Sequence, residues 1–181
     1  MDFFTLASRR QSVRRFRDKA VEREKIMRCL EAARIAPSTS NSQPWKFIVI
    51  DEPRLKAHLA GQTIGPLRSF NTFVDQAPVL VAVLADGSNL EARAGRFARN
   101  LDFSLIDIGI ATEHFCLQAT ELGLGTCILG WFHEKAVKKA LGVPKGSRIC
   151  LIVALGYPQE ETVRPKRRKP LEATYCYNRY T

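Results

Sequence analysis

Two clusters of cations, one near each end of the 181-residue chain, are the side chains best suited to bind a ligand. The first occupies residues 9–17 and the second residues 164–169. If the first cluster is extended, alternation of side chains places Arg10, Ser12 and Arg14 on one side. Such a row of cations and a hydroxyl could hold a phosphate or a polyol, or it could be an ordinary solvated edge. Spacing alone leaves these two interpretations nearly even.

Polar side chains also fill residues 38–43, between Pro37 and Pro44. The run Ser-Thr-Ser-Asn-Ser-Gln predicts a loop, and the two prolines make it rigid at both ends. The loop could be a capped turn, or it could form a pocket wall whose hydroxyls and amides meet the edge of a heteroaromatic ligand. Composition alone favours the turn.

The side-chain patterns of common catalytic sites are missing from the sequence. His58, His114 and His133 lie where structural roles are more common, and no serine lies in a nucleophile elbow. There is no phosphate-binding loop and no metal-ligand spacing, so we predict no metal site. The Gly-x-Gly at residues 123–125 follows a helical segment instead of a strand, which argues against a dinucleotide fingerprint. A bound cofactor is therefore expected to carry the reactivity.

Composition predicts one globular domain over residues 1–181. With 45% hydrophobic residues, the chain can bury a core of its own. The amino-terminal residues lack a basic segment followed by an apolar run and a cleavage site, so the expected location is the cytoplasm. The five cysteines are odd in number and scattered, which predicts reduced, packed thiols.

A long helical segment at residues 101–123 organises the predicted fold. Its apolar residues form two stripes, so the helix must be covered on more than one face. Asp102, Asp107 and Glu113 interrupt the apolar run, which argues against a membrane span. We therefore predict a buried central helix. A partner subunit is its expected second cover, because the chain has little material left to bury it alone.

Four strand patterns flank this helix in the sequence. In residues 45–50, side chains alternate between the two sides in the pattern of a strand. Continuous apolar runs occupy residues 79–85 and 149–155, and a short strand is predicted at residues 126–129. With helices between them, these strands predict an α+β domain with one central sheet. Residues 159–181 lack periodicity and form a carboxy-terminal arm of the same domain.

Several motifs together resemble the FMN-dependent nitroreductase family of NAD(P)H-dependent flavin oxidoreductases. They occur in the family's order over nearly the whole chain, and a Pro-Ser-x-x-Asn-x-Gln-Pro-Trp run with a distant Gly-Tyr-Pro is rare by chance. The matching segments are residues 9–16, 31–47, 107–111, 121–127 and 154–158. The resemblance implies a nitroreductase-like α+β fold, with a central, mostly antiparallel sheet surrounded by helices and a long buried central helix. It also implies an interlocked homodimer with two FMN molecules at the subunit interface.

The resemblance assigns roles to the two cation clusters. Arg10, Ser12 and Arg14 match the family motif that holds the FMN phosphate and ribityl chain. Lys166 and Arg168 match the basic pair that completes the phosphate site. A bound phosphate would account for part of the net charge of +10.

Two further groups of residues match positions near the flavin ring. The loop that packs against the flavin from the neighbouring subunit is matched by Pro37, Ser38, Thr39, Ser40 and Asn41. Leu129 and Gly130 match the strand end whose backbone amides face flavin N5. A backbone donor there would favour hydride acceptance without a titrating side chain. We therefore predict no catalytic side chain, with the chemistry at flavin N5.

The sequence departs from the family pattern at a few positions. Some relatives carry an acidic residue at the position of Leu129, where only the backbone can act in this chain. Asn71 is the nearest candidate for a contact to the pyrimidine edge, although Phe70 and Phe73 leave the register open. Trp131 could line the space above the flavin or pack in the core.

These observations predict a cytoplasmic FMN oxidoreductase. Hydride would pass from NAD(P)H through flavin N5 to a nitroaromatic, a quinone or a similar acceptor by a ping-pong mechanism. Within the family, dehalogenation, dehydrogenation and flavin storage are the alternatives. A basic nucleic-acid-binding module would also suit the net charge, but the aromatic residues do not interleave with the cations as a stacking platform requires. We therefore expect no nucleic-acid partner and no membrane partner.

Overall fold

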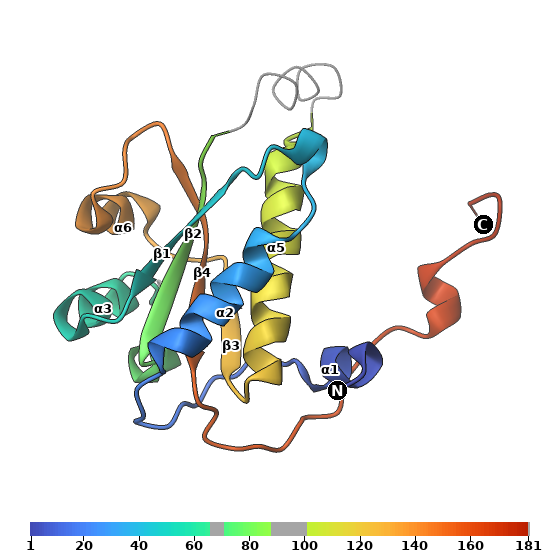
Figure 1. Ribbon diagram of the computed structural model, residues 1–181, viewed down its shortest axis with the longest axis horizontal. Helices are drawn as coiled ribbons and strands as arrows, with labels where there is room; N and C mark the ends of the chain where they lie inside the picture. Colours follow the sequence, from blue (N-terminus) through green and yellow to red (C-terminus); the bar gives the residue numbers. More distant parts are fainter. Residues whose placement is uncertain (66–70, 88–100, 181) are drawn as a thin grey trace.

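The structure is a computed structural model that describes residues 1–65, 71–87 and 101–180 (Figure 1). Its helices are α1 (Phe3–Arg9), α2 (Arg23–Arg34), α3 (Pro53–Gly61), α5 (Phe103–Glu121) and α6 (Glu134–Leu141). Its strands are β1 (Trp45–Ile50), β2 (Val79–Ala85), β3 (Gly125–Leu129) and β4 (Arg148–Gly156). Short 3-10 helices are η1 (Thr39–Asn41), η2 (Thr72–Gln76) and η3 (Leu171–Thr174). Phe70 lies outside the described residues, as does the polar helical stretch or lid that the sequence predicts at residues 90–98.

The strands form one antiparallel sheet in the order β1-β2-β4-β3, which confirms the predicted α+β architecture. β2 and β4 lie in the middle, and the side chains of β2 from Val79 to Leu84 are buried on both faces. A strand covered on both faces reads as a continuous apolar run, which is the pattern that predicted it. β1 and β3 form the edges, so the outer side of β3 is open to pair with other segments.

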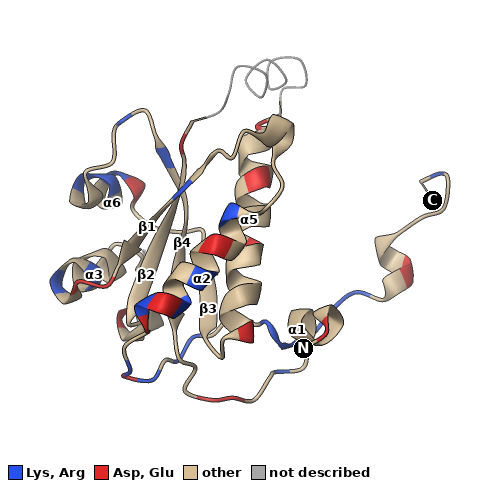
Figure 2. Cartoon of the chain, viewed as in Figure 1, with Lys and Arg blue, Asp and Glu red and all other residues tan. Residues whose placement is uncertain are grey.

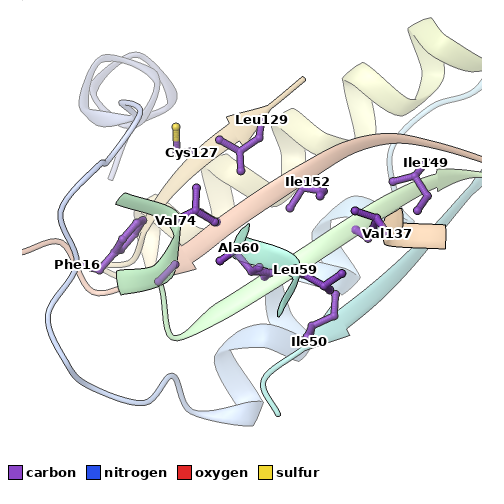
Figure 3. Packing of buried hydrophobic residues seen from close by; sticks show 14 of the residues in the cluster. Phe16, Ile50, Leu59, Ala60, Val74, Cys127, Leu129, Val137, Ile149 and Ile152 are labelled. Atoms are coloured by element: carbon purple, nitrogen blue, oxygen red, sulfur yellow. The ribbon is translucent and has the colours of Figure 1, made fainter. Parts of the chain in front are cut away.

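Helices cover both faces of this sheet. α2 and α5 pack together on one face, where Ile108 and Phe115 of α5 share a buried cluster with Val81 of β2. α3, α6 and η2 cover the other face, and Figure 3 shows the cluster beneath them, which includes Leu59 and Val137. The sheet therefore separates two apolar layers. Because helices cover both of its faces in the described part of the chain, a ligand can reach the sheet only at its edges.

α5 is the long helix that the sequence predicts. Its start is capped by Asp102, whose carboxylate accepts a hydrogen bond from the Ser104 N–H at 3.3 Å. Its end is followed by Gly123 at a φ of 75°, a left-handed conformation that glycine adopts without strain. One face packs on α2 and the sheet, but Leu105 and Ile106 on another face are 40% and 48% exposed. A single chain therefore covers only part of this helix.

The carboxy-terminal arm starts beside the segment that follows α1. The Gln159 N–H donates to Arg15 O at 3.0 Å, and Arg17 pairs with Glu161 at 3.1 Å. Residues 159–180 are exposed throughout, and Figure 1 shows the arm running past α1 and away from the body of the molecule. The arm therefore places the cations of residues 164–169 next to the cations of residues 9–17.

Candidate functional site

The segment of residues 10–14 is held against the open edge of the sheet. The Val13 N–H donates to Thr126 O at 2.8 Å, and Ser12 forms a parallel bridge with Thr126. Gly125 permits this close approach, because a Cβ atom there would lie 2.6 Å from Val13 Cγ2. The segment is therefore fixed in the extended form that the alternation of its side chains requires.

One glutamine fastens the arm to this segment. The Gln11 side-chain amide donates to Thr162 O at 3.0 Å, and its oxygen accepts from the Arg164 backbone N–H at 3.1 Å and from Arg164 Nε at 3.2 Å. The Arg164 guanidinium also donates to Ser12 O. The roles of Gln11 and Arg164 were not predicted, because their contacts join residues more than 150 positions apart. The only signal for Arg164 was its place in the second basic cluster.

This contact gathers both basic ends of the chain around one cavity of about 340 Å³. The predicted phosphate residues all line it, namely Arg10, Ser12, Arg14, Lys166 and Arg168, together with Gln11, Arg164, Pro165 and Arg167. We call Arg10, Arg14, Arg164, Lys166 and Arg168 the cation cluster. Figure 2 shows these two basic stretches in blue, beside α1 and along the arm.

The cation cluster is short of negative charge. Among the described residues, Glu113 of α5 is the carboxylate that pairs with it, 3.3 Å from Arg10 Nε. The geometry is that of an ion pair without a hydrogen bond, so the buried Arg10 Nε has no hydrogen-bond acceptor in the described part of the chain. Partial desolvation lowers the pKa of Lys166, and the charges of Arg10 and Arg168 lower it further. Cations that oppose one another's charge in this way gain free energy when an anion enters.

The polar loop of residues 38–43 is present and has a strained backbone. Ser40, Asn41 and Gln43 have φ angles of 50°, 51° and 46°, in the left-handed region that residues other than glycine seldom adopt. The Gln43 N–H donates to Ser38 Oγ at 2.9 Å, which closes the loop on itself. Ser40 and Asn41 are exposed at its tip.

A carboxylate on α5 ties this loop to the centre of the fold. Asp107 Oδ1 accepts from the Thr39 N–H at 3.1 Å and from Thr39 Oγ1 at 3.2 Å. In the sequence Asp107 stood out as a charge that interrupts an apolar helix and as the first residue of a family-matching segment, residues 107–111. No local pattern connects it with a loop 68 residues earlier.

The end of β3 carries the third group of predicted residues. Leu129 is 3% exposed, and Figure 3 shows its side chain within the core cluster. Because Thr126 O faces away from β4 toward Val13, alternation directs the backbone of Leu129 toward β4 and that of Gly130 toward the open edge. The backbone amides of Ile128 and, one residue past the end of the strand, Gly130 are therefore directed toward this open edge.

Asn71 and Trp131 lie beside this strand end. Asn71 has a φ of 64°, and its side-chain amide donates to Thr63 O at 3.0 Å and to Trp131 O at 3.4 Å. The Trp131 side chain is 41% exposed, with the His133 ring edge-on at 5.0 Å between ring centroids. Trp131 therefore faces solvent instead of filling the core, whereas Phe73 packs against the core cluster.

The predicted site residues thus form three groups in a single chain. The phosphate residues share one cavity, and neither the loop of residues 37–41 nor the group of Asn71, Leu129 and Gly130 lines it. The structure therefore brings together cations from the two ends of the chain. It keeps the residues predicted at the flavin ring outside the lining of that cavity.

Metal and membrane sites have no counterpart in the described ranges. No group of three or more His, Cys, Asp or Glu residues there could hold a metal ion, and no helix there is long and apolar enough to cross a bilayer. Cys29, Cys116 and Cys127 are buried, as predicted, whereas Cys150 is half-buried and Cys176 is exposed, so the prediction of packed thiols is wrong for Cys176. Burial raises the pKa of Cys29 to about 12 and that of Cys116 to about 11. These two thiols therefore stay protonated and unreactive at neutral pH.

Proteins of known family resemble this chain over the helices and strands that build the candidate site. The sequence profile described as the Nitroreductase family matches residues 7–157, from α1 to the end of β4. The chain belongs to the nitroreductase family. The profile ends before the arm, so the part of the cation cluster from Arg164 onward lies outside the matched region of this nitroreductase-family chain.

Relatives of this family member have oxidoreductase names. The chain is 32% identical over 157 residues to an Archaeoglobus fulgidus protein provisionally named NADH dehydrogenase/NAD(P)H nitroreductase, an alignment that covers 84% of this chain and 83% of that protein. It is similar to the structure of an FMN-dependent nitroreductase from Clostridium difficile, with a TM-score of 0.80, 26% identity, and coverage of 98% of this chain and 100% of the other. It is also 25% identical over 198 residues to the iodotyrosine deiodinase of Thermotoga neapolitana, covering 98% of each chain.

Proposed function

We propose that this protein is an NAD(P)H-dependent oxidoreductase that uses bound FMN to pass hydride to a nitroaromatic, a quinone or a similar acceptor. The observation that carries the proposal is the cation cluster, because every residue predicted at the FMN phosphate lines its cavity. Membership of the nitroreductase family and the likeness to an FMN-dependent nitroreductase support the choice of cofactor.

The residues present fit the phosphate of FMN. Arg10 Nε is a buried donor with no hydrogen bond to any described residue, and Lys166 lies among cations that lower its pKa. A phosphate with about two negative charges would accept hydrogen bonds from the guanidinium groups and offset the repulsion between them. Ser12, between Arg10 and Arg14 on the same segment, would donate its hydroxyl to the ribityl chain.

The residues expected around the flavin ring would hold it through backbone and amide groups, and none of them would need to gain or lose a proton. When bound, FMN supplies reversible hydride chemistry at N5, so NAD(P)H and the acceptor would use one site in turn. The strand end at Leu129 and Gly130 would face the ring, with the Gly130 N–H as the open donor near N5. Asn71 would approach the pyrimidine edge. The loop of residues 37–41 would pack on the ring from the neighbouring subunit and exclude water there.

A homodimer would cover surface that one chain leaves open. Phe3 and Phe4 on α1 are 71% and 81% exposed, and Leu105 and Ile106 on α5 are also open. Leu171, on the arm, is 70% exposed. These exposed apolar side chains lie on α1, on α5 and on the arm, and a partner subunit would cover them. We expect the arm of each subunit to lie on its partner, and we expect the dimer to reside in the cytoplasm.

The purified protein tests the proposal directly. We expect a yellow protein that releases FMN on denaturation, identified by mass spectrometry, and that oxidises NADH or NADPH when a nitroaromatic or a quinone is supplied. Initial rates at several acceptor concentrations should give the parallel double-reciprocal lines of a ping-pong mechanism. A colourless protein that takes up no FMN on reconstitution would contradict the proposal.

Reductive dehalogenation is the alternative favoured by a specific observation. The chain and an iodotyrosine deiodinase align over 98% of each chain. An enzyme with this activity would release halide from a halogenated tyrosine when supplied with reducing equivalents. Faster turnover of that substrate than of any nitroaromatic or quinone would favour the alternative, and both readings require bound FMN.

A further inference from the structure

Asp107 is a charged residue buried in α5, among apolar neighbours. It is 3% exposed, and its Oδ1 accepts both hydrogen bonds from Thr39. Its Oδ2 is buried and makes no hydrogen bond to any described residue. A buried carboxylate with one bare oxygen stabilises a fold less than an apolar side chain of similar size would. Stability alone therefore does not account for a carboxylate at this position.

What this carboxylate holds is the strained loop. Left-handed backbone at Ser40, Asn41 and Gln43 persists only where the surroundings hold it in place. Thr39 is the first residue of η1, and the next turn depends on it, because the Ser42 N–H donates to Thr39 O at 3.0 Å. Fixing Thr39 therefore fixes the direction in which the exposed tip of the loop faces.

We propose that Asp107 is a positioning residue whose carboxylate holds Thr39 so that the loop presents a preformed surface to the flavin ring. This inference rests on the proposed function, because it takes the loop as one wall of the flavin site. Holding the loop in its binding shape before the ligand arrives removes an ordering cost from the binding step. Asp107 itself need not touch the flavin.

Two flavins separate this role from that of the cation cluster. FMN and riboflavin share the ring and differ in the phosphate, so a residue that acts through the loop should affect both equally. Asp107→Ala is expected to weaken both FMN and riboflavin binding about tenfold, because it removes two hydrogen bonds to a charged acceptor. The ratio of the two affinities should stay unchanged. Fluorescence titration of the flavin-free protein with each flavin measures all three quantities.

The same helix supplies a matched control. Thr112 of α5 is 1% exposed, and its Oγ1 also has no hydrogen-bond partner among the described residues. Thr112→Val removes a buried polar atom that makes no hydrogen bond to the loop, so both flavin affinities should stay unchanged. Asp107→Asn keeps an acceptor oxygen for Thr39 and should recover most of the lost affinity. Thr39→Val removes one of the two hydrogen bonds and should cause a smaller loss, which serves as the test if Asp107→Ala does not fold.

Hydrogen exchange in the flavin-free protein gives a readout that does not depend on activity. Asp107→Ala should speed exchange of the Asn41 and Ser42 amides, whose hydrogen bonds close the loop, while the amides of β2 keep their protection. The inference is wrong if folded Asp107→Ala binds both flavins as tightly as the unchanged protein, or if Thr112→Val loses as much affinity. If the unchanged protein binds neither flavin, the proposed function fails instead.

Discussion

The cation cluster and the loop of residues 38–43 are built on opposite electrostatic principles. The cluster brings positive charges from both ends of the chain close together, and Gln11 holds the two ends to each other. The loop rests on one buried negative charge, that of Asp107, and its shape is closed by its own hydrogen bonds. Among the described residues, the cluster pairs with one carboxylate, that of Glu113, whereas hydrogen bonds within the chain already fix the shape of the loop.

This difference predicts that the two parts of the proposed site respond to different changes. Exposed charges are screened by salt and respond to pH, so affinity for the phosphate should depend on both. A preformed loop contributes through its shape, so affinity for the ring should be nearly independent of salt. Comparing FMN with riboflavin measures the two contributions separately.

Removing charge from the cluster should have the largest effect. The double variant Lys166→Ala, Arg168→Ala should weaken FMN binding by at least about 100-fold, because it removes two donors and hydrogen bonds to charged groups contribute about 1.5–3 kcal/mol each. Riboflavin binding should not change. Lys169→Ala makes a similar change of charge on the arm, but Lys169 does not line the cavity, so it is the matched control. An equal loss of riboflavin affinity in the double variant would contradict the distinction between the two regions.

Displacing the segment that carries Arg10 and Arg14 should have the next largest effect. In Gly125→Ala the new Cβ would lie 2.6 Å from Val13 Cγ2. Overpacking of this kind lowers the free energy of unfolding by about 1–3 kcal/mol, which urea denaturation measures. FMN affinity should fall more than riboflavin affinity. Gly146→Ala, where a Cβ meets nothing within 4 Å, should leave both stability and binding unchanged.

Releasing the arm should separate FMN affinity from riboflavin affinity without changing any charge. Gln11→Ala removes the side chain that bonds to Thr162 and Arg164, so FMN affinity should fall about tenfold while riboflavin affinity stays the same. In the flavin-free protein, trypsin should cut the basic part of the arm faster. Gln159→Ala is the control, because Gln159 bonds to Arg15 through its backbone. Equal rates of cleavage in the two variants would show that Gln11 does not hold the arm.

Raising the pH should weaken the contribution of the phosphate to FMN affinity and leave riboflavin affinity unchanged. This is the smallest of the four expected effects. Desolvation, followed by Arg10 and Arg168, lowers the pKa of Lys166 below its ordinary value of 10.5. In the flavin-free protein, charged Lys166 lowers the free energy of unfolding at pH values below its folded pKa, and this unfavourable contribution disappears as the pH rises toward 10.5. The ratio of FMN to riboflavin affinity should fall about fivefold over the same interval, the scale of one exposed ion pair. Lys166→Ala should remove this pH dependence, and a ratio that stays pH-dependent in that variant would assign it to another group.

Local patterns were sufficient to predict most of the fold. The apolar run of β2 and the two stripes of α5 reflect burial on more than one side, and burial of that kind shows directly in residue type. The short 3-10 turns η1, η2 and η3 were not predicted as helices, because so few residues carry no periodicity.

The candidate site was predicted in part. Alternation placed Arg10, Ser12 and Arg14 together, and the family resemblance added Lys166 and Arg168, which line the same cavity. Between Leu129 and Gly130, only the register of β3 against β4 shows which amide is open. The roles of all these residues toward FMN stay predictions until the binding experiments above are made.

The sequence by itself determined the α+β class, the nitroreductase family, the long central helix and the two basic ends of the chain. These properties depend on residue type and on near neighbours along the chain. Only the tertiary structure decided that Gln11 holds the arm beside residues 10–14, and that Asp107 anchors a loop 68 residues earlier. Both depend on a few hydrogen bonds between distant residues, and contacts of that kind leave no periodic pattern in the chain.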